Sequence, residues 1–245
     1  MPDDIPPPPL SLLDGAALFL DFDGTLVELA EAPDAISVPG ELAGLLEHLS
    51  VRLEGRLALV SGRALGDLDR HIDCPGVAMS GSHGLELRLA DGRVLPVARP
   101  PALDAASEEI RRFVERGGEG LIVEEKPASV AVHFRRAPER ESEVASLVDR
   151  LAARTGLVVQ RGKMVAELRP AGADKGDALV ALMREPGFAG ARPLFMGDDL
   201  TDEHAFEAAA HLGGAGVLVG PRRETAARYR LDGVAEVAQW LRAAA

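Results

Sequence analysis

The sequence predicts an α/β fold: a doubly wound parallel-sheet core with an inserted α+β cap domain. Two observations lead to this prediction. First, short apolar runs at residues 16–20, 57–60 and 77–80 are separated by longer segments, and such runs are typical of strands buried in a parallel sheet. Second, the middle of the chain has a different pattern, in which paired strands follow each of two helices, and this favours an α+β module.

The core elements follow one another in the expected order. Residues 40–49 carry leucines at helical spacing on one face, which indicates a helix packed on the sheet. Residues 85–97 alternate around Asp91-Gly92, a typical hairpin turn. In the last third of the chain we expect a helix at 174–183, strands at 193–196 and 217–219, and a helix at 233–243.

The middle of the chain is expected to contain two helix-plus-hairpin units. The helices are predicted at 102–116 and 138–154, and the strands at 121–125, 129–134, 157–160 and 163–168. We therefore divide the chain into a first core part at 1–98, a cap domain at 99–167 and a second core part at 168–245.

Composition excludes several classes of function. A formal charge of −12 disfavours binding to nucleic acid and to anionic membranes, and aromatic residues at 4% offer few stacking surfaces for single strands. An acidic protein that binds an anion needs a local cation or a metal. We expect a small-molecule substrate, no nucleic-acid or membrane partner, and a monomer.

Several features of the sequence favour a cytoplasmic protein. Cys74 is the only cysteine, so no disulfide can form within the chain. No lysine or arginine precedes Arg52, and no apolar run approaches the roughly 18 residues that a membrane helix needs. Residues 1–9 are acidic and rich in proline, and we expect them to form a loose tail.

Polar residues follow three of the predicted strands. Asp21 to Asp23, Ser61 to Arg63 and Gly197 to Asp202 each begin where an apolar run ends. Ligands of open parallel sheets bind beyond the carboxyl ends of the strands, so these segments are expected to converge. Four carboxylates gathered there would repel one another unless a divalent cation is bound, and oxygen ligands suit Mg²⁺; the four are Asp21, Asp23, Asp198 and Asp202.

Lysine is rare, which draws attention to the lysines that are present. Only three of the 27 basic residues are lysines, namely Lys126, Lys163 and Lys175. A compact point charge is one reason to keep lysine in a sequence that otherwise uses arginine.

Four ordered motifs resemble those of the haloacid dehalogenase superfamily. They are DFDGTL at 21–26, the serine of SGR at 61–63, the lysine of DKGD at 174–177 and GDDLTDE at 197–203. The resemblance spans the whole chain. It implies a phosphatase in which Asp21 is the nucleophile that forms an aspartyl-phosphate, and Asp23 is the general acid and base.

The same resemblance implies roles for the other motif residues. Mg²⁺ would be held by the Asp21 side chain, the Asp23 backbone carbonyl and the Asp198 side chain. Catalytic Lys175, with Ser61 and the Gly62 amide, would bind the phosphoryl oxygens. Asp202 would orient Lys175 or a metal-bound water, and Asp199 is a second candidate for an orienting role.

Three further segments resemble the trehalose-6-phosphate phosphatase family. They are GSHG at 81–84, EEKPASVAVHFR at 124–135 and KMVAELRP at 163–170. The resemblance implies that five cap residues contact sugar hydroxyls: Glu124, Lys126, Arg135, Lys163 and Glu167. Arg63 and His83 are further candidate substrate contacts, although a structural role for His83 between two glycines is an open alternative.

The resemblance predicts hydrolysis of trehalose 6-phosphate to trehalose and phosphate, as a step of trehalose biosynthesis. Three alternatives stay open at this point: a phosphatase for another sugar phosphate such as sucrose phosphate, a phosphomutase, and a regulator that binds trehalose 6-phosphate without turnover. Asp21 and Asp23 speak against the regulator, because binding alone needs no acid or base.

Overall fold

A computed structural model describes residues 5–29, 36–95, 99–117, 119–126, 128–162, 164–171 and 174–245. The chain forms two compact units, Met1–Leu95 with Ala173–Ala245, and Pro96–Gly172. We call the first the core unit and the second the cap unit. The predicted end of the cap domain at residue 167 falls within a strand that continues to Arg169.

The core unit is built on an eight-stranded sheet with the order β12-β11-β10-β1-β2-β3-β4-β5 among the described residues. The six strands from β12 to β3 pair in parallel, whereas β4 pairs antiparallel with both β3 and β5. The strands are β1 (Ala16–Leu20), β2 (Leu57–Val60), β3 (Ala78–Gly81), β4 (Glu86–Arg88), β5 (Val94–Leu95), β10 (Arg192–Gly197), β11 (Ala215–Val219) and β12 (Tyr229–Leu231).

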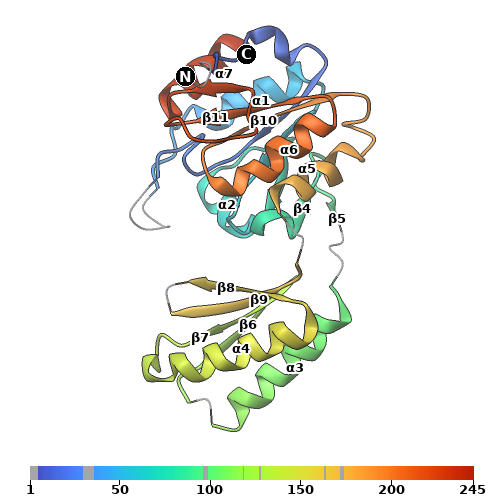
Figure 1. The fold of residues 1–245 in the computed structure, drawn as a ribbon. Helices are drawn as coiled ribbons and strands as arrows, with labels where there is room; N and C mark the ends of the chain where they lie inside the picture. Colours follow the sequence, from blue (N-terminus) through green and yellow to red (C-terminus); the bar gives the residue numbers. More distant parts are fainter. Residues whose placement is uncertain are drawn as a thin grey trace. The chain divides into compact units, whose positions relative to one another are not determined.

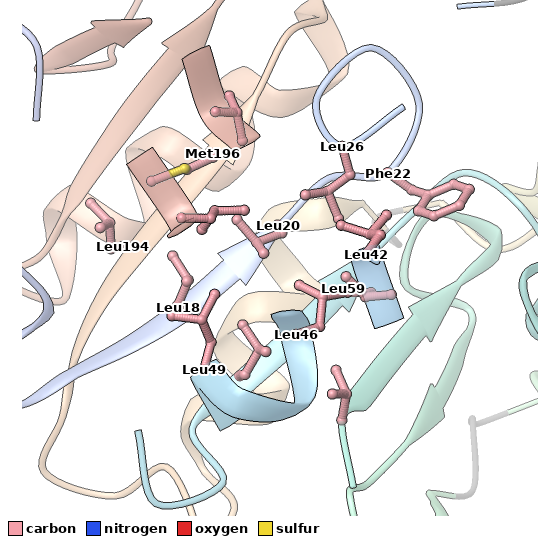
Figure 2. Close-up of a cluster of buried hydrophobic side chains, with 14 of the residues drawn as sticks. Leu18, Leu20, Phe22, Leu26, Leu42, Leu46, Leu49, Leu59, Leu194 and Met196 are labelled. Carbon is pink, nitrogen blue, oxygen red and sulfur yellow. The ribbon is translucent and has the colours of Figure 1, made fainter. Parts of the chain in front are cut away.

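Helices cover both faces of this sheet, as Figure 1 shows. One face packs on α1 (Leu42–Arg52), α2 (Leu65–His71) and α7 (Val234–Ala244), and the other on α5 (Lys175–Met183) and α6 (Glu203–His211). The sequence of strand β1 is wholly apolar because helices bury both of its faces. Leu18 and Leu20 face α1, whereas Phe19 faces α5 and α6. Figure 2 shows the cluster on the α1 face. The predicted doubly wound fold is confirmed.

The predicted elements agree with the structure except near their ends. Strands at 16–20 and 57–60 have the expected bounds, and the hairpin turns at Asp91-Gly92. Helix α2, helix α6 and strand β12 are not among the predicted elements. Helix α2 has only seven residues, and a segment so short carries little helical periodicity.

In the part that the structure describes, the cap unit is a four-stranded antiparallel sheet with two helices on one face. Buried Val130, Val132 and Leu168 pack against these helices. Because cross-strand partners share a face, Glu124, Ala131 and Glu167 lie together on the opposite face. The elements are α3 (Pro101–Glu115), β6 (Ile122–Lys126), β7 (Ser129–His133), α4 (Glu141–Thr155), β8 (Val158–Gly162) and β9 (Val165–Arg169), and the sheet order is β6-β7-β9-β8.

The prediction of a loose tail over residues 1–9 is wrong for its described end. Pro8 is buried, and its carbonyl oxygen accepts a 2.7 Å hydrogen bond from Nε1 of Trp240 in α7. The carbonyl of Pro6 accepts a 3.0 Å bond from the amide of Arg230. These bonds and the prolines' restricted backbone hold the segment on the core. Residues 1–4 lie outside the described residues.

Among the helices that the structure describes, none combines the length and apolar character needed to cross a membrane.

Candidate active site

Three carboxylates meet at the carboxyl edge of the core sheet. Oxygens of Asp21, Asp198 and Asp202 all lie within 4.8 Å of one another. Strands β1 and β10 are parallel neighbours that end side by side, with Leu20 opposite Met196. Two predicted metal ligands, Asp21 and Asp198, are therefore brought together by the sheet, and Asp202 joins them from the turn before α6.

Lys175 lies inside this acidic cluster. Its Nζ is 2.7 Å from Oδ1 of Asp21 and 2.6 Å from Oδ1 of Asp202, and the side chain is only 4% exposed. Burial disfavours the ammonium ion, but the two carboxylates outweigh burial and raise the pKa of Lys175. The lysine stays charged, and Asp174 fixes its position by accepting a hydrogen bond from the Asp177 amide at the start of α5.

The remaining negative charge suits a divalent cation. Burial raises the pKa of Asp21, and repulsion from Asp202 and Asp198 adds to it; burial also raises the pKa of Asp198. One lysine balances only part of three carboxylates, and hard oxygen donors are the ligands that Mg²⁺ prefers. Gly24 leaves the space for this arrangement, since a Cβ there would lie 2.1 Å from Oδ2 of Asp198.

The two orienting candidates differ in their surroundings. Asp202 is fully buried, and its Oδ2 accepts a 2.9 Å hydrogen bond from the Asp199 amide while Oδ1 holds Lys175. Asp199 is exposed, and its Oδ1 accepts from the Leu200 amide at 2.6 Å. The contacts of Asp202 fit an orienting role toward Lys175, whereas Asp199 caps the turn.

The turn after β2 links the predicted phosphate site to Asp23. Ser61 is buried, and its Oγ accepts a 3.1 Å hydrogen bond from the Arg63 amide, while Gly62 is exposed. The Arg63 guanidinium binds both oxygens of Asp23, at 2.7 and 2.8 Å. The hydrogen bond with Asp23 is the main reason that the pKa of Arg63 is raised. Asp23 directs its carboxylate at Arg63 rather than into the acidic cluster, so its predicted metal contact would use the backbone oxygen.

His83 lies against the same turn. A Cβ on Gly62 would be 2.7 Å from the His83 ring, and the His83 amide donates to the Ser61 carbonyl at 3.1 Å. The backbone of His83 is left-handed, with φ 54°, which costs a non-glycine residue conformational energy. The loop therefore holds the ring next to the predicted phosphate-binding amide.

In the cap unit, three of the predicted sugar residues form an ion pair and a hydrogen bond on the sheet face opposite the helices. Nζ of Lys126 is 3.2 Å from Oε1 of Glu167, which also accepts a hydrogen bond from Ser129. Oε2 of Glu124 is 2.7 Å from Nε2 of His133.

Arg135 and Lys163 are the other two predicted sugar residues. Arg135 is exposed and lines a cavity of about 520 Å³ with Glu124 and His133. Lys163 lies outside the described residues.

Some residues of both sites are missing from the sequence prediction. Asp67 binds Nη1 of Arg63 at 2.8 Å, and its i, i+4 spacing from Arg63 is a signal that could have revealed it. His133 and Ser129 reach Glu124 and Glu167 through strand pairing, and the sequence does not state the register of β6, β7 and β9.

Comparison with known proteins assigns the chain to one family. The profile described as Trehalose-phosphatase matches residues 19–235, which includes every motif discussed above. The chain belongs to the trehalose-phosphatase family. The family predicted from the motifs is thereby confirmed.

Curated relatives and solved structures agree with the family. The chain is 44% identical over 211 residues to a probable trehalose-phosphate phosphatase of Sinorhizobium fredii, covering 85% of this chain and 79% of that protein. It is 37% identical over 226 residues to the trehalose-6-phosphate phosphatase of Escherichia coli K12, covering 92% and 85%.

A solved trehalose-6-phosphate phosphatase related protein is similar, with a TM-score of 0.63, 26% identity, and coverage of 92% of this chain and 95% of that one. The Aspergillus fumigatus trehalose-6-phosphate phosphatase shares the fold at 24% identity, with a TM-score of 0.67 and 98% coverage of both chains.

Proposed function

We propose that the chain hydrolyses trehalose 6-phosphate to trehalose and inorganic phosphate through an aspartyl-phosphate on Asp21, with Mg²⁺ as its cofactor. The observation that carries this proposal is the cluster of Asp21, Asp198, Asp202 and Lys175 in a trehalose-phosphatase family chain. The two curated relatives described above act, by name, on trehalose phosphate.

In the first step, a carboxylate oxygen of Asp21 attacks phosphorus, and the bond from phosphorus to the sugar oxygen breaks. Asp23 gives its proton to the departing oxygen. Lys175, Ser61 and the Gly62 amide hold the phosphoryl oxygens while their charge redistributes. Asp21, Asp198 and the Asp23 carbonyl would hold Mg²⁺, which would supply the positive charge that lets a carboxylate approach a phosphate.

In the second step, water attacks the phosphorus of the aspartyl-phosphate. Asp23, which gave up its proton, now takes one from this water, and the bond between Asp21 and phosphorus breaks. Phosphate leaves and both aspartates return to their starting states. Asp202 keeps Lys175 in place throughout, because it is buried and its Oδ1 is bound to the ammonium group at 2.6 Å.

We assign recognition of the sugar to the cap unit. Glu124, Lys126 and Glu167 lie on the sheet face that the cap helices leave uncovered, and they bind other polar side chains there. Arg135 and Lys163 complete the predicted set. Charged groups that are already paired can exchange partners with sugar hydroxyls at low cost, since the hydroxyl both donates and accepts.

Phosphate release measured across a panel of sugar phosphates tests the substrate. We expect kcat/KM for trehalose 6-phosphate to exceed that for glucose 6-phosphate and sucrose 6-phosphate by at least about tenfold, which corresponds to one hydrogen bond with a charged group. A preference for sucrose phosphate would overturn the assignment. Retention of phosphate on the sugar, without release, would indicate a phosphomutase.

Metal exchange tests the cofactor. EDTA should remove activity and Mg²⁺ should restore it, because the three carboxylates require a cation to bind phosphate. Ca²⁺ should bind but support little turnover, since its larger coordination shell displaces the nucleophile. Full turnover in EDTA would contradict the proposed role of Mg²⁺. A monomeric state and a cytoplasmic location stay predictions from composition.

A further inference from the structure

We propose that Arg63 is a positioning residue that holds the carboxylate of Asp23 in place for acid–base catalysis, rather than a contact for the sugar. The inference rests on the proposed function, in which Asp23 moves the protons. It changes the role first expected for Arg63, and it connects the phosphate-binding turn with the acid–base group.

The contact between the two side chains is bidentate. Nε of Arg63 donates to Oδ2 of Asp23 at 2.7 Å, and Nη2 donates to Oδ1 at 2.8 Å. A planar guanidinium that binds both oxygens fixes the plane of the carboxylate as well as its distance. A lysine in the same place would fix only the distance.

Arg63 is itself held from several directions. Its backbone amide donates to Oγ of Ser61 at 3.1 Å, and its carbonyl accepts from the amide of Ser82 at 2.7 Å. Nη1 donates to Oδ2 of Asp67 in α2 at 2.8 Å. The Arg63 side chain is 11% exposed, so these bonds are partly shielded from water.

The last residue of β3, Gly81, packs closely against the backbone of the turn that carries Arg63. A Cβ on Gly81 would lie 2.8 Å from the carbonyl oxygen of Arg63 and 2.7 Å from the amide of Leu65. The backbone of Arg63 is thus packed against β3, and its side chain extends from a fixed base to Asp23. Because the position of Arg63 is fixed in this way, its guanidinium can fix the position of the Asp23 carboxylate.

The orientation of Asp23 matters most where a proton must be delivered. A sugar alkoxide is a poor leaving group and needs the proton of Asp23, whereas p-nitrophenolate departs without one. Loss of the clamp should therefore slow the release of trehalose more than the release of p-nitrophenol in the first step. In steady state both substrates should slow, since hydrolysis of the common aspartyl-phosphate needs Asp23 as a base.

The first experiment compares Arg63→Met and Arg63→Lys with the wild type. In single-turnover measurements at saturating enzyme, we expect the rate of trehalose release to fall at least about tenfold, part of the 10²–10⁴-fold that acid–base catalysis contributes. The rate of p-nitrophenol release should fall less, and KM for trehalose 6-phosphate should change less than about threefold. The lysine variant keeps the charge and loses the fork, so it should not restore the rate.

Arg70→Met is the matched control. Arg70 also binds Asp67, at 2.5 Å, but its side chain is 71% exposed and, among the described residues, forms no hydrogen bond or ion pair with Asp23, so its removal should leave all these rates unchanged. A KM for trehalose 6-phosphate that rises tenfold in Arg63→Met, at unchanged kcat, would show a sugar contact and overturn the proposal.

A double-mutant cycle decides whether Arg63 acts through Asp23. In the Asp23→Asn background, Arg63→Met should lower steady-state turnover of p-nitrophenyl phosphate by less than about twofold, because the group that it positions is already inactive. Effects that multiply would refute the proposal. Failure of the wild type to hydrolyse trehalose 6-phosphate would instead refute the substrate assignment, and the cycle with p-nitrophenyl phosphate would still decide the role of Arg63. If Arg63→Met does not fold, the cycle is made with Arg63→Lys.

Discussion

The two units hold their charged residues in different environments. In the core unit, Asp21, Lys175 and Asp202 are at most 4% exposed and bind one another at 2.6–2.7 Å. In the cap unit, the side chains of Lys126 and Glu167 are 29% and 19% exposed, and their ion pair measures 3.2 Å. The core has a fixed site for one chemical group, and the cap has a half-exposed surface of paired charges.

This difference fits the two tasks that we propose for the two units. Stabilising a transferring phosphoryl group requires charges that do not move and that water does not screen, and burial provides both. Recognising a sugar requires hydrogen-bonding groups that can change partners, which half-exposed side chains do more easily. The comparison therefore predicts large effects on folding and chemistry from changes in the core, and effects on substrate choice from changes in the cap.

The largest expected effect is on stability: Lys175→Met should lower the free energy of unfolding far more than Lys126→Met. Removing the Lys175 ammonium leaves Asp21 and Asp202 buried without their partner, and breaking a buried pair in this way costs about 3–5 kcal/mol. Lys126 is partly exposed, and its replacement should cost less than about 1 kcal/mol of stability. Urea unfolding of the two variants measures the difference.

Added Mg²⁺ sharpens this test. It should stabilise Lys175→Met against urea more than it stabilises the wild type, because the variant has one cation fewer among its carboxylates. Equal costs for the two lysines, or no stabilisation by Mg²⁺, would contradict the described difference between the sites.

Gly24→Ala should lower the affinity for Mg²⁺. The backbone of Gly24 has a φ of 79°, and an added Cβ would meet the carboxylate of Asp198 at 2.1 Å. Asp198 must then move, and a displaced ligand or neighbour typically lowers metal affinity about 10–100-fold. Titration of activity with Mg²⁺ measures the change. Gly92→Ala, at a loop glycine with φ 85° and open space, is the control for backbone strain alone.

The sequence predicted the core site more completely than the cap site, for a physical reason. Asp21, Ser61 and Asp198 immediately follow apolar strands, so the topology of a parallel sheet alone brings them to one edge. The pairing of Glu124 with His133 depends on the register of β6 and β7, which no local pattern shows. The cap residues could be named in advance only from resemblance to a family.

The contact between Arg63 and Asp23 was predicted only in part. Both residues were predicted to belong to the site, yet the sequence does not reveal that their side chains bind each other. Helix α2 was missed because it is short, and with it the third partner, Asp67. Motifs thus indicate which residues gather, while the partners of each side chain follow from turns and packing.

Cys74 is buried in the core unit but has no role in the proposed mechanism, so changing it should have the smallest effect on activity. Burial raises the pKa of its thiol to about 12. At pH 8 the thiol is protonated, so iodoacetamide should alkylate the folded protein far more slowly than the unfolded chain. Because the folded pKa is raised, the contribution of Cys74 to stability is present at neutral pH and declines as the pH rises above about 9. Rapid alkylation at pH 8 would contradict this burial.

The division of labour between the units is tested most directly by measuring kcat/KM of Glu167→Ala and Asp21→Asn on two substrates, trehalose 6-phosphate and a small aryl phosphate. Glu167 accepts hydrogen bonds from Lys126 and Ser129, and losing a charged acceptor is worth about 1.5–3 kcal/mol. Glu167→Ala should therefore lose about 10–150-fold on trehalose 6-phosphate and almost nothing on the aryl phosphate. Asp21→Asn, nearly isosteric, should keep the fold and lose both activities. Equal losses on both substrates in Glu167→Ala, or turnover by Asp21→Asn within about tenfold of the wild type, would contradict the account.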